Sequence, residues 1–276
     1  RWQMVPAYVL SGVLAAAWLL QRAATAGDFA APSWIHWIVV PLGALSLVLS
    51  VALPVAFPVF RLPRPTGPFA IGTTTYHWVD VERHDVFSED PKARREVMVQ
   101  VWYPAEAGRS APRAPYTPNA AILGPLARLM RAPEFVLRHP ALVTTDAIVD
   151  APVAPAMPAY PLLLFSHGRG GFRGHNTAQV QELASHGYVV AAIDHPHVAA
   201  GVAFPDGRVT PFDPRMYDPQ HVGHPPLLDQ VLTSLAKDLV LALDRLSALD
   251  PGETNSVLAG RLDLDRVAAF GVSLGG

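Results

Sequence analysis

The sequence predicts an α/β fold in which a mostly parallel sheet is flanked by helices and preceded by two transmembrane helices. Three observations lead to this prediction. Two long uncharged runs stand near the N-terminus, and short apolar runs alternate with helical patterns from about residue 160 onward. A serine between glycines follows the last apolar run. The 276 residues are enough for one or two domains.

The composition excludes several classes of function. The net charge of −2 offers no basic field for nucleic acid, so we expect no nucleic-acid partner. The chain has no cysteine, which excludes disulfides, cysteine-ligated zinc and a thiol nucleophile. Hydrophobic residues make up 50% of the chain, and their excess lies at the N-terminus. We expect neither a metal nor a cofactor.

The two uncharged runs extend from Met4 to Leu20 and from Ile35 to Phe60, where His36 is the only ionisable residue. Each is long enough to cross a hydrocarbon core of about 30 Å. Aromatic residues lie near their ends, as is typical of interfacial anchors: Trp2, Tyr8, Trp34 and Trp37. We therefore predict that residues 1–64 form a membrane region with two helices and a linker, which would place the protein in the membrane. The alternative is a buried hairpin of two core helices.

Residues 65–276 are predicted to form the N-terminal part of a soluble domain. Residues 72–81 and 96–103 are expected to be strands, and in the second strand Val97, Val99 and Val101 face one side. The region 104–159 is rich in proline and alanine and contains one predicted helix, residues 119–130. We interpret it as a surface excursion that could act as a lid.

Strands and helices alternate in the last part of the chain. The predicted strands cover residues 161–165, 188–193 and 267–270, and the predicted helices cover 176–186 and 227–249. Asn176 is the expected N-cap of the first helix, and Gly187 follows its end. The apolar stripe of the second helix comprises Leu228, Val231, Leu232, Leu235, Leu239 and Leu246.

The strongest chemical signal is Gly271-Val272-Ser273-Leu274-Gly275, which fits the G-x-S-x-G nucleophile elbow of α/β hydrolases. In this turn from strand to helix the serine hydroxyl projects out of the sheet, and glycines stand where backbone approaches backbone. Such a pentapeptide arises by chance in about one chain in ten of this length. The preceding strand pattern favours the elbow, so Ser273 is the predicted nucleophile.

A second signal is the glycine-rich turn that begins Ser166-His167-Gly168-Arg169, directly after a predicted strand. In α/β hydrolases this loop and the residue after the nucleophile supply the two backbone N–H groups of the oxyanion hole. Here these would be the N–H groups of Arg169 and Leu274. The alternative is an ordinary glycine-rich turn.

These segments resemble the plasma-type, group II platelet-activating factor acetylhydrolases, whose fold is that of the α/β hydrolases. The resemblance lies in FSHGRGGFR (residues 165–173), ELASHGYVVAAIDH (182–195), GVSLGG (271–276) and MVQVWYPA (98–105). It implies a bacterial, membrane-anchored member in which Ser273 is the nucleophile. It also implies that Arg169 and Leu274 are the oxyanion donors and that the substrate is a phospholipid with a short acyl chain.

The triad aspartate and histidine of this family follow the elbow, so we expect both beyond Gly276. The sequence is accordingly interpreted as C-terminally truncated, and the fragment itself is expected to be inactive and poorly folded. Two histidine pairs, His195/His197 and His221/His224, have a spacing that metal ligands can have, but no third ligand accompanies them in the sequence pattern. Asp194 is expected to cap a turn or shape the pocket rim, and Arg173 and His175 to contact phosphate or to lie in a solvated loop.

The predicted function is a membrane-anchored serine ester hydrolase, by resemblance a 1-alkyl-2-acetylglycerophosphocholine esterase of lipid catabolism. One alternative on the same fold is a general carboxylesterase, a dienelactone-type hydrolase or a polyester hydrolase. An alternative of another class is a membrane-anchored binding protein that keeps the fold without catalysis.

Overall fold

The computed structural model describes residues 2–26, 34–106, 108, 111–216, 225–249 and 256–276. The chain divides into two compact units, residues 1–60 and 61–276. The boundary predicted at residue 64 lies four residues after this division.

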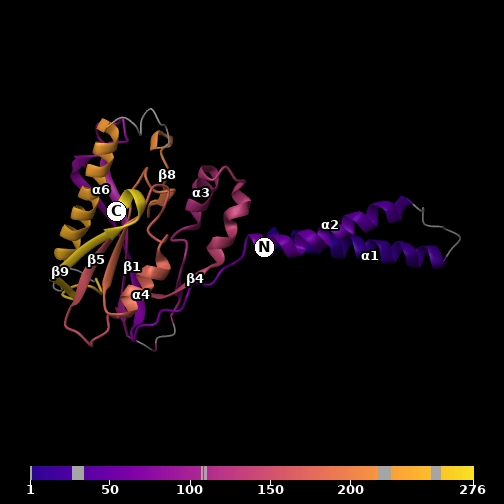
Figure 1. The fold of residues 1–276 in the computed structure, drawn as a ribbon, viewed down its shortest axis with the longest axis horizontal. Coiled ribbons are helices and arrows are strands. Elements are labelled where there is room, and N and C mark those ends of the chain that lie inside the picture. Colours follow the sequence, from indigo (N-terminus) through magenta and orange to yellow (C-terminus); the bar gives the residue numbers. More distant parts are fainter. Residues whose placement is uncertain (1, 27–33, 107, 109–110, 217–224, 250–255) are drawn as a thin grey trace. The chain divides into compact units, whose positions relative to one another are not determined.

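The N-terminal unit is a pair of helices, α1 (Val5–Ala26) and α2 (Trp34–Ala56), preceded by the short η1 (Trp2–Met4). The two helices run side by side (Figure 1). Pro41 and Pro54 lie inside α2, so neither ends the helix. Among the described residues, α2 provides one 20-residue stretch, residues 37–56, that is long and apolar enough to cross a membrane. The apolar part of α1, residues 5–20, is shorter, so the structure supports one spanning helix where the sequence predicted two.

The second unit is built on a seven-stranded mixed sheet with the order β3-β4-β1-β2-β6-β5-β9. Its strands are β1 (Ala70–His84), β2 (Arg94–Ala105), β3 (Arg113–Pro115), β4 (Thr144–Val149), β5 (Tyr160–Ser166), β6 (Val189–Asp194) and β9 (Leu262–Gly271). The half that carries the site, β6-β5-β9, is parallel, whereas β2 pairs antiparallel with both β1 and β6. A separate two-stranded ribbon joins β7 (Gly201–Ala203) to β8 (Val209–Pro211).

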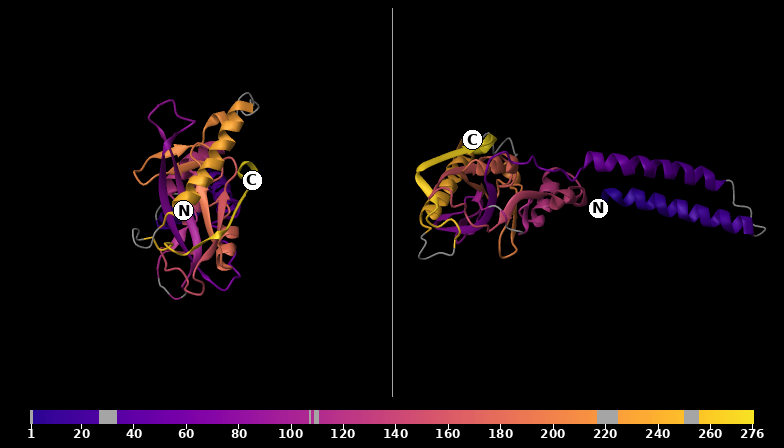
Figure 2. Two further views of the ribbon diagram at one scale, coloured as in Figure 1. Left: turned by 90° about the vertical axis from the view of Figure 1, so that its left-hand side faces the viewer. Right: turned by 90° about the horizontal axis from the view of Figure 1, so that it is seen from below.

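Helices cover both faces of this sheet (Figures 1 and 2). The α-helices of the unit are α3 (Leu123–Leu129), α4 (Thr177–Ser185) and α6 (Pro225–Ser247). Short 3-10 helices are η2 (Ala120–Ile122), η3 (Glu134–Leu142), η4 (Pro214–Met216) and η5 (Ser273–Gly275). The three-layer arrangement confirms the α/β class predicted from the alternation of strands and helices.

The period-two pattern of β2 sorts its side chains onto two cores. Val97, Val99 and Val101 join Ala242 and Leu246 of α6 in the core on one face. The intervening Trp102 joins Val180 and Ala184 of α4, together with Val190 and Ala192 of β6, in the core on the other face. The predicted facing of Val97, Val99 and Val101 is therefore confirmed, and the sheet is buried between α4 and α6.

Thr66 and Gly67, which precede β1, pack against α4. Thr66 donates its backbone N–H to Glu182 at 2.9 Å, and Gly67 donates to the Ser185 hydroxyl at 3.0 Å. A side chain at Gly67 would come within 2.1 Å of the Ser185 carbonyl oxygen, so glycine is required by this close approach. Residues 66 and 67 are therefore already packed as part of the second unit.

Several local predictions need correction. Residues 104–159 are not only a surface excursion, because they contribute β3 and β4 to the sheet. Asn176 forms no side-chain cap, whereas Asn119 accepts a hydrogen bond from the N–H of Ala121 at 2.9 Å. Leu232 is 41% exposed, because the buried stripe of α6 passes through Asp238 instead.

Candidate active site

The last strand ends in a sharp turn at Ser273. β9 runs to Gly271, and Ser273 then adopts a left-handed φ of 54°, which is uncommon for a residue with a side chain. A Cβ on Gly271 would lie 1.9 Å from the Gly275 carbonyl oxygen, and one on Gly275 would lie 2.4 Å from the Ser166 carbonyl oxygen. Both glycines therefore have the steric role that the motif predicts, and the strained turn leaves Ser273 exposed.

The glycine-rich turn after β5 lies directly against this elbow. Ser166 is in register with Gly271, and the N–H of Val272 donates to the Ser166 carbonyl at 3.3 Å. A Cβ on Gly168 would come within 2.9 Å of the Val272 carbonyl oxygen and 3.0 Å of the Ser273 Cβ. The structure thus brings the turn that contains Arg169 into contact with the segment that contains Leu274.

The turn is attached from its other side to residues 195–200, the loop that follows β6. The N–H of Gly170 donates to the Val198 carbonyl at 2.9 Å, and the N–H of Ala200 donates to the Gly171 carbonyl at 2.8 Å. Gly170 has a φ of 69°, the left-handed region that glycine adopts without strain. The position of the turn therefore depends on the position of this loop.

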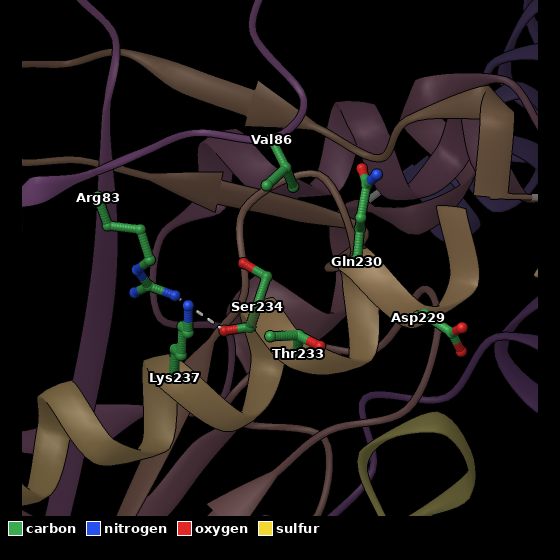
Figure 3. A pocket seen from close by; sticks show the side chains of 7 residues that line it. All are labelled: Arg83, Val86, Asp229, Gln230, Thr233, Ser234 and Lys237. Carbon is green, nitrogen blue, oxygen red and sulfur yellow. Dashed lines mark hydrogen bonds between the residues drawn. The ribbon is translucent and has the colours of Figure 1, made fainter. Parts of the chain in front are cut away.

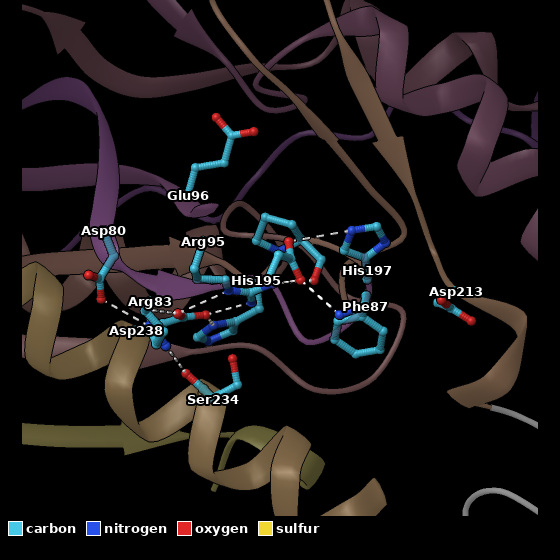
Figure 4. A network of polar contacts seen from close by, with 12 residues as sticks. Asp80, Arg83, Phe87, Arg95, Glu96, His195, His197, Asp213, Ser234 and Asp238 are labelled. Atoms are coloured by element: carbon cyan, nitrogen blue, oxygen red, sulfur yellow. Dashed lines mark hydrogen bonds and ion pairs between the residues drawn. The ribbon is translucent and has the colours of Figure 1, made fainter. Parts of the chain in front are cut away.

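A buried series of hydrogen bonds runs from the turn through His195 to Asp238 of α6, and Figure 4 shows its His195–Asp238 part. The Ser166 hydroxyl lies 3.1 Å from His195 Nε2, and His195 Nδ1 lies 2.9 Å from the Asp238 carboxylate. Because a carboxylate only accepts, Nδ1 carries the hydrogen, so a neutral His195 accepts the Ser166 proton at Nε2. Ser166 is 1% exposed, and His195 and Asp238 are 0% exposed.

Two arginines compensate the charge of Asp238. Arg95, which is fully buried, donates from Nη2 to the carboxylate at 2.7 Å and from Nη1 to the Pro196 carbonyl at 3.2 Å. Arg83 donates to the other oxygen of Asp238 at 2.6 Å. Burial alone would raise the pKa of Asp238, but Arg95 and the hydrogen bond from His195 hold that pKa well below its usual range. The carboxylate is therefore ionised at neutral pH.

The neighbouring His167 is neutral. Its Nδ1 donates to the Gly168 carbonyl at 2.8 Å, and its Nε2 accepts the backbone N–H of His195 at 3.2 Å. Complete burial and the nearby His195 lower the pKa of His167 to about 3. A protonated ring could not accept at Nε2, so the turn needs the neutral form of this histidine.

Of the two histidine pairs considered as metal ligands, one lies among the described residues and the other outside them. His195 and His197 face different carboxylates: His195 bonds to Asp238, whereas His197 stacks on Phe87 with ring centroids 4.9 Å apart and lies 3.6 Å from Asp85. Arg95 contacts both carboxylates and so joins the two histidines in one polar network. No group of three His, Cys, Asp or Glu side chains that could hold a metal occurs among the described residues. His221 and His224 lie outside the described residues.

Asp194 and Arg173 form a buried pair. The Asp194 carboxylate accepts both the backbone N–H and the guanidinium of Arg173. Arg173 is therefore buried on a carboxylate, not solvated, and Asp194 anchors the turn from the end of β6. His175 is exposed and stacks on Phe172, with ring centroids 6.1 Å apart.

The sequence analysis missed Asp238 and Arg95, although the sequence contains a signal for each. Asp238 follows Val231 and Leu235 by seven and three residues, which is the spacing of the buried face of α6. Arg95 precedes Val97 by two residues and so continues the buried face of β2. A charged residue on the predicted core face of each of two elements is the sequence signal for a buried ion pair.

Two cavities adjoin this network. One of about 330 Å³ lies between α6 and the end of β1 and is lined by Arg83, Val86, Asp229, Gln230, Thr233, Ser234 and Lys237 (Figure 3). Its Arg83 donates to the Ser234 carbonyl at 3.0 Å. A second cavity, of about 300 Å³, lies between α6 and the elbow and is lined mainly by apolar residues, with Ser166 at one wall. The second cavity places apolar space next to the turn that presents Ser273.

The chain is similar in sequence to several platelet-activating factor acetylhydrolases. The chain is 28% identical over 232 residues to a platelet-activating factor acetylhydrolase of Cavia porcellus, with 78% of this chain and 50% of that protein covered. It is 31% identical over 134 residues to the Bos taurus acetylhydrolase, which covers 42% of this chain and 30% of that protein. The chain thus spans half or less of the length of these relatives.

A solved structure gives independent support for the fold. Ferulic acid esterase from Streptomyces cinnamoneus superposes with a TM-score of 0.61 and 34% sequence identity, covering 78% of this chain and 56% of that one. A family model described as platelet-activating factor acetylhydrolase, isoform II, matches residues 55–206, more than half of the chain. The chain therefore belongs to the platelet-activating factor acetylhydrolase, isoform II, family of α/β hydrolases.

Proposed function

We propose that this protein is a serine ester hydrolase in which Ser273 is the nucleophile. The observation that carries the proposal is the strained, exposed Ser273 at the end of β9, in contact with the glycine-rich turn. A strained turn of this kind persists where the surrounding structure enforces it, and such turns cluster at active sites. Membership of a family of ester hydrolases supports the same assignment.

In the proposed mechanism the Ser273 oxygen attacks the ester carbonyl while a histidine beyond Gly276 takes the hydroxyl proton. An aspartate beyond Gly276 orients that histidine. The N–H groups of Arg169 and Leu274 stabilise the negative oxygen of the tetrahedral intermediate, which collapses to an acyl-enzyme as the alcohol leaves with the proton. Water then attacks the acyl-enzyme, releases the acid and restores Ser273.

We propose that the substrate is an ester with a short acyl chain, and specifically a phospholipid acetylated at sn-2, as the names of the acetylhydrolase relatives suggest. The alternative is a general carboxylesterase, which the superposition on a ferulic acid esterase favours. Hydrolysis rates for an sn-2 acetyl phospholipid, a p-nitrophenyl ester series and a feruloyl ester would separate the two. A kcat/KM at least tenfold higher for the phospholipid is expected, and a preference for the feruloyl ester would refute the phospholipid assignment.

Catalysis itself is tested by covalent labelling. A fluorophosphonate probe should label the full natural chain at Ser273, identified by peptide mapping, because the probe reports an activated serine. The Ser273→Ala variant should not be labelled, whereas Ser247→Ala, an exposed serine on α6, should be labelled as the wild type is. Failure to label the folded wild type would favour the non-catalytic binding protein.

We further propose that residues 1–64 anchor the hydrolase domain, residues 65–276 and beyond, in a membrane. The support is α2, which exposes large apolar side chains, Trp37 at 81% and Val55 at 75% among them. α1 would accompany it as the second, shorter apolar helix. Carbonate washing should leave the protein in the membrane pellet, and deletion of residues 1–64 should release it. A full natural chain that stays soluble without detergent would contradict the anchor.

A further inference from the structure

The buried chain Ser166–His195–Asp238 has the bonding order of a catalytic triad, yet its serine does not reach solvent. The Ser166 hydroxyl, the His195 ring and the Asp238 carboxylate are joined by hydrogen bonds of 3.1 and 2.9 Å. Ser166 is 1% exposed, and the backbone of Gly275 lies against it. The adjacent cavity touches Ser166 only at one wall and is otherwise lined mainly by apolar residues. The Ser166 hydroxyl is therefore enclosed by protein, and it meets the His195 ring.

Two members of this hydrogen-bonded series, Ser166 and His195, are attached to the segments that would bind the oxyanion. The Ser166 carbonyl accepts the N–H of Val272, the residue directly before Ser273. His195 begins the loop 195–200, whose Val198 and Ala200 bond to the glycine-rich turn. A shift of the His195 ring would therefore move the turn and the elbow relative to each other.

Asp238 fixes the position of the His195 ring through its hydrogen bond to Nδ1. The carboxylate is itself held by Arg95 and Arg83 (Figure 4). Arg95 also donates to the carbonyl of Pro196 in the same loop. Every side chain of this network is anchored on a strand or helix, except His195, which directly follows β6. Packed elements position groups more accurately than free loops do.

We propose that Ser166, His195 and Asp238 are positioning residues that set the distance between the oxyanion turn, residues 166–171, and the nucleophile elbow, residues 271–275. The inference rests on the proposed function, because the two segments are the sites of the proposed oxyanion donors. The network does not perform chemistry on the substrate. It acts through the backbone N–H groups of Arg169 and Leu274, which stabilise the transition state more than the bound ester.

The test is Ser166→Ala in the full natural chain, since this change removes only the hydroxyl that meets His195 Nε2. The kcat for p-nitrophenyl acetate should fall by between about tenfold and about a hundredfold with KM within twofold of wild type, because small misplacements at a reacting centre cost rates of this order. Affinity for a trifluoromethyl ketone, which mimics the tetrahedral intermediate, should fall by the same factor as kcat/KM. The variant Ser166→Cys keeps a weak donor to Nε2 and should recover part of the lost kcat.

The matched control is Ser247→Ala, whose hydroxyl donates to the Leu243 carbonyl on the exposed side of α6, and it should leave both kcat and ketone affinity unchanged. A Ser166→Ala enzyme with wild-type kcat and ketone affinity would overturn the proposal. So would fluorophosphonate labelling of Ser166 in a Ser273→Ala background, since Ser166 would then be a nucleophile. Loss of the folded state in both Ser166 variants would overturn it too, because the network would be holding the fold instead of a distance. A wild-type protein without any turnover would instead refute the proposed function.

Discussion

Two serines stand at the ends of neighbouring parallel strands and differ in almost every property that matters for reactivity. Ser166 ends β5, is buried and has a histidine and an aspartate in series with it. Ser273 follows β9, is exposed and sits on a left-handed turn. The comparison shows that hydrogen-bond order alone does not identify a nucleophile. Access to substrate and presentation by the backbone separate the proposed catalytic serine from the buried one.

The largest expected difference between the two serines is in turnover. Ser273→Ala should lower kcat by roughly 10⁶-fold, the effect that removal of a triad serine has when base and oxyanion hole act as a unit. Ser166→Ala should retain at least about one hundredth of the activity. Steady-state hydrolysis of p-nitrophenyl acetate by the two variants measures both effects, and equal losses would erase the distinction between the serines.

The turn that presents Ser273 should not tolerate a methyl group. Gly271→Ala places a Cβ 1.9 Å from a backbone oxygen that cannot rotate away, so we expect a loss of more than about 4 kcal/mol in the free energy of unfolding. Gly43→Ala is the control, because its new Cβ would meet only Leu10 Cδ1 at 3.5 Å. Thermal melts of the two variants provide the measurement, and a Gly271→Ala protein as stable as the control would show that the elbow is looser than described.

The buried serine depends on charge compensation that the exposed serine does not share. Asp238→Asn removes the carboxylate 2.7 Å from Arg95 and leaves this buried guanidinium with Asp85 at 3.5 Å, so the free energy of unfolding at pH 7 should fall by about 3 kcal/mol. Asp244→Asn, on the exposed face of the same helix, should change it by less than about 0.5 kcal/mol.

The pH dependence of this difference follows from the lowered pKa of Asp238. A carboxylate with a depressed folded-state pKa stabilises above its unfolded value of about 3.9 and loses that contribution as pH falls toward the folded value. The difference in the free energy of unfolding between wild type and Asp238→Asn should therefore be constant from pH 5 to 8 and should narrow below about pH 4. Denaturant unfolding across this range measures this difference, and a difference that widens in acid would contradict the ionised carboxylate.

A smaller effect is expected from His167, whose folded-state pKa is about 3. Between that value and the ordinary value near 6.5 the unfolded chain binds a proton that the native ring cannot, so stability falls as pH falls. From pH 7 to pH 5 this group alone should cost about 2 kcal/mol. His167→Gln should lose this component of the pH dependence, whereas His186→Gln, an exposed change, should keep it.

The sequence by itself determined the alternation of strands and helices after about residue 160 and the glycine spacing around Ser273. A period of two in residues 97–101 predicted which side chains of β2 meet α6, because alternation follows from strand geometry alone. The spacing of glycines around Ser273 predicted the elbow, because the clash that excludes a side chain involves residues only four apart.

Only the tertiary structure decided which polar groups meet. Ser166, His195 and Asp238 are separated by 29 and 43 residues, and their contact depends on the strand order and on how α6 crosses the sheet. Periodicity places Asp238 and Arg95 on buried faces but does not name their partners, since a buried charge can be satisfied by any ligand that the fold brings within about 3 Å. The exposure of Ser273 and the burial of Ser166 are likewise decided by packing, because the two serines end strands that are adjacent only in the folded sheet.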